Sequence, residues 1–266
     1  MNLQDSRILL TGAGSGIGRS LALQLGAKGA NVALVGRNRA KLETIVREIQ
    51  ARGGTARAFA FDLSLPSGQK ELVDDVVGAL GDIDILINNA GISEFCDFSR
   101  QGTEAIESLV RTNVTGPLLL THAVLPYFLR KDSGRIVNVG STFGTIGFGH
   151  FSVYSATKFA MRGFSESLRR ELDHTFIGVT YVAPRATKTA LNGDAVVELN
   201  RRTGIAMDEP DDVAGKIIRA IESGAKDCYL GWPEKCFARI NALFPRLVDK
   251  ALEKNNKIAR GLLKCQ

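Results

Sequence analysis

Tyr154 and Lys158 are the two residues of this sequence whose types and spacing suit acid–base chemistry. They lie four residues apart, so on a helix of ~3.6 residues per turn they share one face and reach the same small volume. An ammonium group favours the phenolate form of a nearby tyrosine, and lowering a phenol pKa from about 10 to near neutrality requires about 4 kcal/mol. The pair therefore predicts a proton donor that works at physiological pH. The alternative is two solvated helix side chains, because this spacing also occurs by chance.

A glycine-rich loop spans residues 11–18, between an apolar run typical of a strand and a helical stretch. Glycines let the backbone turn tightly and approach a diphosphate, whose charge then faces the amino end of the following helix. A strand before the loop and a helix after it distinguish a dinucleotide site from an ordinary glycine turn. The sequence therefore predicts a dinucleotide-binding loop that contains Gly12, Ser15, Gly16, Ile17 and Gly18.

Arg37 follows the second expected strand, at the position that usually selects the nicotinamide cofactor. An acidic residue there would accept hydrogen bonds from the adenosine ribose hydroxyls. An arginine instead suits a 2′-phosphate, because its guanidinium group pairs with two oxygens at once. This position favours NADP(H) over NAD(H), with a solvated arginine in a surface turn as the alternative.

The elements that must position these residues alternate between short β-branched runs and helical stretches. This pattern predicts a parallel sheet covered by helices on both faces. The alternation ends between residues 185 and 208, where a lid or binding loop is expected. The expected strands are residues 7–11, 31–36, 55–61, 84–88, 135–140, 177–183 and 228–231. The longest expected helices are residues 103–130, interrupted at Gly116-Pro117, and residues 153–174.

The composition restricts the class of protein. A chain of 266 residues that is 44% hydrophobic can bury a large core as one α/β domain. Its four cysteines and three histidines have no metal-ligand spacing, so we expect free thiols and no metal site. We see no signal peptide and no run long enough to span a bilayer, and we expect a soluble cytoplasmic protein. The net charge of +6 is confined to residues 235–266, so we expect no nucleic-acid partner.

Several further motifs follow in order along the chain: Asp62, Asn88-Asn89-Ala90-Gly91, Asn113 and Ser141. Together with the glycine loop and Tyr154-x-x-x-Lys158, they resemble the short-chain dehydrogenase/reductase superfamily over roughly residues 5–232. The resemblance implies an α/β fold, a single Rossmann-type doubly wound domain with a seven-stranded parallel sheet, in residues 1–232. It also implies an enzyme that transfers hydride between a nicotinamide and a carbonyl or alcohol carbon of a small molecule, commonly as a homodimer or homotetramer.

The same resemblance assigns roles to individual residues. Tyr154 is the general acid in reduction and the general base in oxidation, while Lys158 lowers its pKa and holds the nicotinamide ribose. Ser141 hydrogen-bonds the substrate oxygen, and Asn113 anchors a water that links Lys158 to solvent. The other implied cofactor contacts are Asp62 and Leu63 at the adenine, Asn89 and Ala90 beside the adenosine ribose and diphosphate, and Pro184 and Thr189 at the nicotinamide end.

Pro117 supplies an independent reason for a role of Asn113. In a helix each N–H donates to the carbonyl four residues back, and Pro117 has no N–H. The Asn113 carbonyl therefore loses its helical donor, and a carbonyl left open at a kink is a natural water site. The alternative is a proline kink without a functional role.

Arg185 departs from the family pattern, which usually has glycine after the proline at this position. Glycine would allow close backbone approach to the nicotinamide, whereas arginine adds bulk and charge. We expect Arg185 to change how the amide end of the cofactor is held or to reach into the substrate cleft.

Residues 233–266 are expected to form a basic amphipathic C-terminal extension, with Lys and Arg at three-, four- and seven-residue intervals and apolar residues on the other face. One interpretation is a terminal helix that packs on its own body or on a neighbouring subunit. The other is peripheral contact with an anionic membrane surface, or with a substrate that carries acyl and phosphate groups.

Two other functions remain open at this stage. A sugar-nucleotide epimerase or dehydratase shares the glycine loop and the tyrosine–lysine pair, but it generally needs a larger C-terminal domain. A non-catalytic NADP(H)-sensing protein would not need Ser141, Tyr154 and Lys158. The substrate itself is expected to be apolar, because the apolar residues expected around the pocket are Phe143, Phe148, Phe151, Leu191 and Val196.

Overall fold

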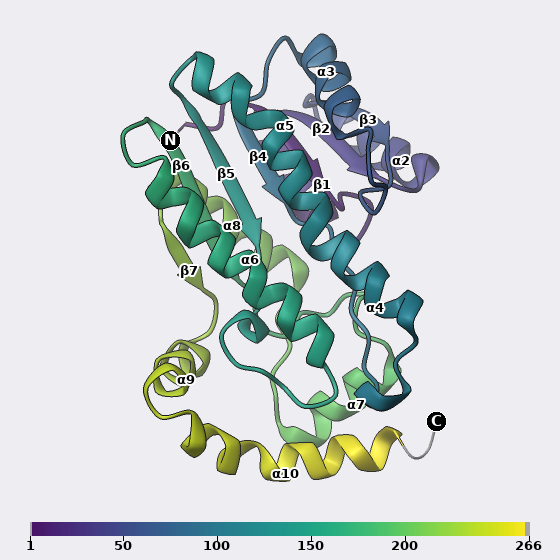
Figure 1. The fold of residues 1–266 in the computed structure, drawn as a ribbon. Helices are drawn as coiled ribbons and strands as arrows, with labels where there is room; N and C mark the ends of the chain where they lie inside the picture. The colour runs from purple at the N-terminus through teal and green to yellow at the C-terminus, as the bar shows by residue number, and fades with distance from the viewer. Residues whose placement is uncertain (1, 264–266) are drawn as a thin grey trace.

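Seven parallel strands form one sheet in the order β3-β2-β1-β4-β5-β6-β7. The computed structural model describes residues 2–263, except for the side chains of residues 232–235 and 238. The seven-stranded parallel α/β sheet that the sequence predicts is confirmed (Figure 1). The strands are β1 (Arg7–Thr11), β2 (Asn31–Gly36), β3 (Thr55–Ala60), β4 (Ile85–Asn88), β5 (Gly134–Val139), β6 (Ile177–Ala183) and β7 (Asp227–Tyr229).

Helices cover both faces of this sheet, as an apolar central strand requires. Successive strand side chains point to opposite faces, so Ile8 and Leu10 join one buried cluster and Leu9 joins another. The first cluster includes side chains of α1 (Gly16–Ala27), α2 (Arg39–Gln50) and α8 (Pro210–Ser223). The second includes side chains of α3 (Gln69–Leu80), α5 (Gly116–Arg130) and α6 (Ser152–Glu171). Burial on both faces fixes the register of the strands.

The helical stretch 103–130, expected to be interrupted at Gly116-Pro117, consists of α4 (Thr103–Val110), a π-helical turn (Arg111–Thr115) and α5. The expected interruption is confirmed, and it lies directly before Gly116. Pro117 stands at the start of α5, where a missing N–H is tolerated. The segment 185–208 was expected to be irregular, and this is wrong in part because it contains α7 (Asp194–Thr203). In Figure 1, α10 (Pro245–Leu263) lies beyond the carboxyl ends of the strands, after α9 (Trp232–Leu243).

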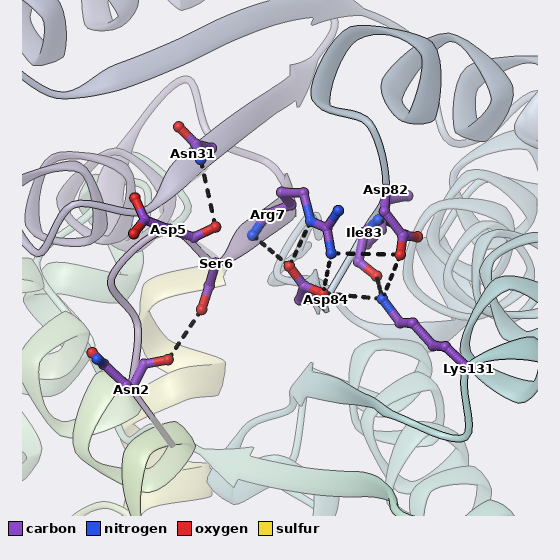
Figure 2. Close-up of polar contacts among 9 residues, drawn as sticks. All are labelled: Asn2, Asp5, Ser6, Arg7, Asn31, Asp82, Ile83, Asp84 and Lys131. Carbon is purple, nitrogen blue, oxygen red and sulfur yellow. Dashed lines mark hydrogen bonds and ion pairs between the residues drawn. The ribbon is translucent and has the colours of Figure 1, made fainter.

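A charged cluster ties the opposite, amino end of the central strands together. Arg7, at the start of β1, donates from Nε and Nη2 to the two carboxylate oxygens of Asp84, at 2.8 Å each. Lys131 donates to Asp84 at 3.0 Å and to Asp82 at 2.9 Å (Figure 2). Burial acts to raise the pKa of Asp84, but the bonds from Arg7 and Lys131 hold it well below its usual range. The cluster therefore stabilises the sheet only while Asp84 is ionised.

Asp84→Asn is expected to lower the free energy of unfolding by about 2 kcal/mol at pH 7, because it leaves Arg7 and Lys131 with a weaker acceptor. A carboxyl with a lowered pKa in the folded state adds stability above its unfolded pKa, near pH 4, and loses it as the pH falls. Urea unfolding from pH 7 to pH 3 should therefore show the difference from wild type shrinking. Asp75→Asn, at an exposed aspartate of α3, is the control, and an equal loss in both variants would contradict the prediction.

Three features are absent from the part of the chain that the structure describes: a membrane-spanning helix, a cluster of metal ligands and a disulfide. Within residues 2–263, no helix is long and apolar enough to cross a membrane. In the same part of the chain, no three or more His, Cys, Asp or Glu side chains gather as a metal site would require. Cys96, Cys228 and Cys236 form no disulfide, and Cys265 lies outside the described residues.

Candidate functional site

A cleft of about 860 Å³ lies along the carboxyl ends of the strands. The strand order changes direction between β1 and β4, which is where open α/β sheets hold ligands. The cleft brings together all the predicted site residues except the buried Asn113. Those that line it are Gly12, Ser15, Gly16, Ile17, Gly18, Arg37, Asp62, Leu63, Asn89, Ala90, Ser141, Tyr154, Lys158, Pro184 and Thr189.

The glycine loop has the shape of a phosphate cradle. Gly12 and Gly16 adopt φ values of +66° and +50°, a backbone region that other residues rarely enter. A Cβ on Gly18 would lie 2.0 Å from the Gly12 carbonyl oxygen, so glycine alone lets α1 start this close to the loop. The first N–H groups of α1 have no helical partner and carry the positive end of the helix dipole. This cradle fits a dinucleotide diphosphate.

Thr11 and Asn89 fasten the two strands on either side of the strand-order change. The Thr11 hydroxyl accepts hydrogen bonds from the backbone N–H groups of Asn89, at 3.0 Å, and Ala90, at 3.1 Å. The Asn89 side chain donates back to the carbonyls of Thr11, at 3.0 Å, and Gly12, at 3.3 Å. These bonds fix the loop after β4 against the glycine loop, so Asn89 and Ala90 line the same end of the cleft.

Arg37 follows β2 and Asp62 follows β3, so both lie at the end of the cleft away from Tyr154 and Lys158. Arg37 is exposed at its edge. Burial acts to raise the pKa of Asp62, but hydrogen bonds from Ser64 and the nearby Arg37 charge hold it below its usual value. Lys41, on the first turn of α2, also lines the cleft. The sequence analysis did not single out Lys41, although its position four residues after Arg37 was a usable signal.

Tyr154 and Lys158 lie on the face of α6 that closes the middle of the cleft. Both side chains are almost fully buried, with 8% and 5% exposed. The Lys158 ammonium lies 5.6 Å from the centre of the Tyr154 ring and donates to the Val139 carbonyl at 3.2 Å. Ser141 caps the short turn after β5 by accepting from the Phe143 N–H at 3.1 Å. All three polar groups therefore meet in one largely dry volume.

Burial dominates the pKa of Tyr154, and the role of Lys158 in lowering it stays a prediction. Burial raises the pKa of Tyr154 to about 12, and the interaction with Ser141 only partly opposes this. Burial also lowers the pKa of Lys158 to about 8. The physical reason is that desolvation disfavours both charged forms.

Asn113 supports the site from behind the cleft. Its side chain is buried in the π-helical turn, accepts from the Ile92 N–H at 2.8 Å, and donates to the Ile92 carbonyl at 2.9 Å. It also donates to the Thr157 hydroxyl at 3.1 Å. Since Thr157 precedes Lys158, this side chain fastens the loop after β4 to the part of α6 that carries Tyr154 and Lys158. In this turn the Gly116 N–H donates to the Arg111 carbonyl, five residues back. The Asn113 carbonyl accepts no hydrogen bond from residue 117, because proline has no N–H.

Arg185 lines the cleft but does not carry a bare charge into it. Its guanidinium group donates to one carboxylate oxygen of Asp208, from Nη2 at 2.6 Å and from Nε at 3.0 Å. Asp208 also accepts the Lys188 N–H through its backbone carbonyl, at 2.9 Å. Arg185 therefore lines the cleft as expected, and its ion pair with Asp208 also joins the two ends of the 185–208 segment.

The part of the cleft beside Tyr154 is apolar. Phe143 stacks on Phe148 with ring centres 5.2 Å apart and lies edge-on to Tyr154 at 6.1 Å. Phe143, Phe148, Phe151, Leu191 and Val196 all line the cleft, as expected. Sequence reasoning missed the contribution of the last helix. Additional lining residues are Leu199 and Asn200 from α7, Phe237 from α9, and Val248, Ala251, Leu252 and Asn255 from α10.

Asn200 is an unusual member of this lining. Its side chain is 7% exposed, and its amide nitrogen has no hydrogen-bond partner. A buried polar group without a partner costs about 1–3 kcal/mol. Asn200 therefore offers a donor beside an otherwise apolar surface.

The family model of the short chain dehydrogenases matches residues 6–199, which include the glycine loop and the tyrosine–lysine pair. The chain belongs to the short-chain dehydrogenase/reductase family. It is 32% identical over 258 residues to YxnA, an uncharacterised oxidoreductase of Bacillus subtilis. This alignment covers 95% of this chain and 72% of that protein. It is 34% identical over 222 residues to the ketoacyl reductase HetN of Nostoc, covering 83% of this chain and 77% of that protein.

Solved structures of the short-chain dehydrogenase/reductase family share the fold. A metagenomic short-chain oxidoreductase in complex with NADP has a TM-score of 0.73 and 29% identity, with 86% of this chain and 97% of that chain covered. A family member from Burkholderia phymatum in complex with NAD has a TM-score of 0.85 over 93% of this chain and 96% of that chain. At 21% identity, the second likeness supports the fold alone.

Proposed function

We propose that this protein is an NADP(H)-dependent oxidoreductase that transfers hydride between the nicotinamide and a carbonyl or alcohol carbon of an apolar substrate. The observation that carries the proposal is the cleft itself, where a buried tyrosine and lysine meet a glycine cradle suited to a diphosphate. The test is NADPH oxidation across ketones, aldehydes and acyl thioester ketones. Tyr154→Phe serves as the blank. An equal rate in wild type and Tyr154→Phe with every substrate would contradict the proposal.

The chain's own residues would hold and protonate the substrate. When bound, the dinucleotide supplies hydride to the carbonyl carbon. The Tyr154 hydroxyl donates a proton to the carbonyl oxygen during reduction and accepts it back during oxidation. Ser141 donates a hydrogen bond to the same oxygen, and the aromatic wall excludes water from it. The high pKa of Tyr154 keeps it protonated, which is the form that reduction requires.

Lys158 and Asn113 would return the proton to Tyr154. A lysine with a pKa of about 8 can give up a proton near neutral pH and regain it from solvent. We propose that the Asn113 carbonyl, which lacks the N–H of Pro117, binds the water that completes this path. We propose that the Lys158 ammonium also holds the nicotinamide ribose.

Arg37, with Lys41 nearby, is proposed to select NADP(H). The two cations line the edge of the cleft, and a 2′-phosphate is the part of NADP(H) that NAD(H) lacks. The NADP-bound metagenomic relative agrees with this choice. Asp62 and Leu63 are assigned to the adenine, and Pro184 and Thr189 to the nicotinamide end.

Arg37→Ala is expected to raise the KM for NADPH about tenfold, equivalent to about 1.4 kcal/mol, and to change the KM for NADH less than twofold. Initial rates with both cofactors check this. The control is Arg39→Ala, since Arg39 is equally basic but pairs with Glu43 at 2.8 Å and does not line the cleft. An unchanged cofactor preference in Arg37→Ala would remove this residue from the cofactor site.

We propose an apolar substrate, because aromatic and aliphatic side chains from several segments surround the space beside Tyr154. We also expect a homodimer or homotetramer, as is common in the family, which analytical ultracentrifugation would detect. Residues 233–266 are proposed to form an extension that completes the substrate end of the 1–232 domain.

A further inference from the structure

The corner between α9 and α10 exposes a compact group of large apolar side chains. Five residues within about three helical turns are 40–72% exposed. Phe237 and Ile240 lie three residues apart on α9, so they share one side of that helix. Leu243 ends α9, Phe244 follows it, and Leu247 lies on the first turn of α10. Exposed apolar side chains that gather in this way mark an interaction site in soluble proteins. The apolar corner is defined by Phe237, Ile240, Leu243, Phe244 and Leu247.

Basic side chains surround this apolar corner. Within residues 236–263, six exposed basic residues accompany two exposed acidic ones, whereas residues 1–234 are neutral overall. Arg246 and Lys250 flank Leu247 directly on the first turns of α10. The basic residues are Arg239, Arg246, Lys250, Lys254, Lys257 and Arg260.

The inner face of α10 is already used within the chain. Val248 and Ala259 are buried, and α10 packs against α7, so the sequence alternative of a docked terminal helix is confirmed. The apolar residues that remain exposed to a partner are therefore those of the apolar corner, and not those on the buried face of α10. Phe237 belongs to both surfaces, because it is 44% exposed at the corner and also lines the cleft.

We propose that the apolar corner and its basic residues form a docking surface for an anionic phospholipid bilayer, through which an apolar substrate enters the cleft. Phe and Leu side chains insert into the boundary between head groups and acyl chains, and Lys and Arg pair with anionic head groups. A second copy of this chain fits less well, because a two-fold contact would place the same basic surface against itself. The route for the substrate rests on the proposed function, whereas the docking does not.

Cosedimentation of the full chain with vesicles tests the docking without turnover. Wild type should bind phosphatidylcholine vesicles that contain phosphatidylserine, bind pure phosphatidylcholine at least tenfold less, about 1.4 kcal/mol, and be released by high salt. Leu243→Ser with Leu247→Ser should lower the partition coefficient about tenfold. Arg246→Glu with Lys250→Glu should lower it about 25-fold or more, since each basic residue contributes about fivefold.

Matched controls change similar side chains elsewhere. Phe176→Ser alters a residue that is 85% exposed at the amino end of β6, and Arg52→Glu with Arg57→Glu reverses two exposed charges near β3. Both should bind vesicles like wild type. Equal binding to anionic and neutral vesicles, or no loss in the corner variants, overturns the proposal. So does a corner variant that dissociates an oligomer in analytical ultracentrifugation while vesicle binding persists, which would assign the corner to a second copy. NADPH oxidation measured without vesicles reports separately on the proposed function.

Discussion

Tyr154→Phe is expected to reduce kcat/KM for carbonyl reduction by about 1000-fold. The substitution removes only the hydroxyl group. Loss of a positioned general acid lowers rates by about 10²–10⁴-fold. Because Tyr154 is almost fully buried and phenylalanine has the same shape, the free energy of unfolding should change by less than about 1 kcal/mol. Steady-state NADPH oxidation and urea unfolding measure the two effects.

Tyr181→Phe is the matched control for this variant. Tyr181 is also buried, and its hydroxyl donates to the Ser141 carbonyl at 3.3 Å, so it touches the same neighbourhood without lining the cleft. Its variant should keep activity within about threefold of wild type. Equal losses in the two variants would show that any buried phenol here is structural, and Tyr154 would lose its assignment as the proton donor.

Lys158→Met should lower activity strongly and make the protein more stable at pH 7. Burial lowers the pKa of Lys158 from 10.5 to about 8, which corresponds to about 3 kcal/mol of destabilisation when the group is charged. Loss of the hydrogen bond to Val139 offsets about 1 kcal/mol of the gain. The expected net stabilisation is therefore about 2 kcal/mol, alongside a loss of kcat/KM of at least about 100-fold.

The gain in stability from Lys158→Met is expected to fall as the pH rises. Below pH 8 the folded and unfolded chains both carry the Lys158 proton, so the penalty of burying the charge is present in full. Between about pH 8 and 10.5 the folded chain binds fewer protons than the unfolded chain, and wild-type stability rises relative to the variant. Chemical unfolding at pH 7 and pH 10 should show the gain of Lys158→Met shrinking.

Lys158→Arg is the control, because arginine keeps its charge throughout this range and should bring no gain in stability. A Lys158→Met protein that is no more stable than wild type at pH 7 would contradict the buried-cation interpretation. Retention of full activity in Lys158→Met would contradict its place in the proton path.

The asparagine network shows which parts of the site local sequence could not indicate. Asn88 donates to Asn138 at 2.9 Å, and Asn138 donates to Ser165 at 2.8 Å, across β4, β5 and α6. Asn88 was recognisable as part of a motif, but Asn138 and Ser165 have no motif of their own. Their meeting depends on strand order and register, which join residues far apart in the chain.

The sequence by itself determined the strands, the parallel sheet and the candidate site residues, because apolar periodicity, glycine loops and fixed motif spacing are local properties of the chain. Only the tertiary structure decided the protonation of Tyr154 and Lys158, the pairing of Arg185 with Asp208, and the use of α10 as a wall of the cleft. Each of these depends on how deeply a group is buried and on which distant group it meets, and desolvation and long-range contact exist only once the chain has folded.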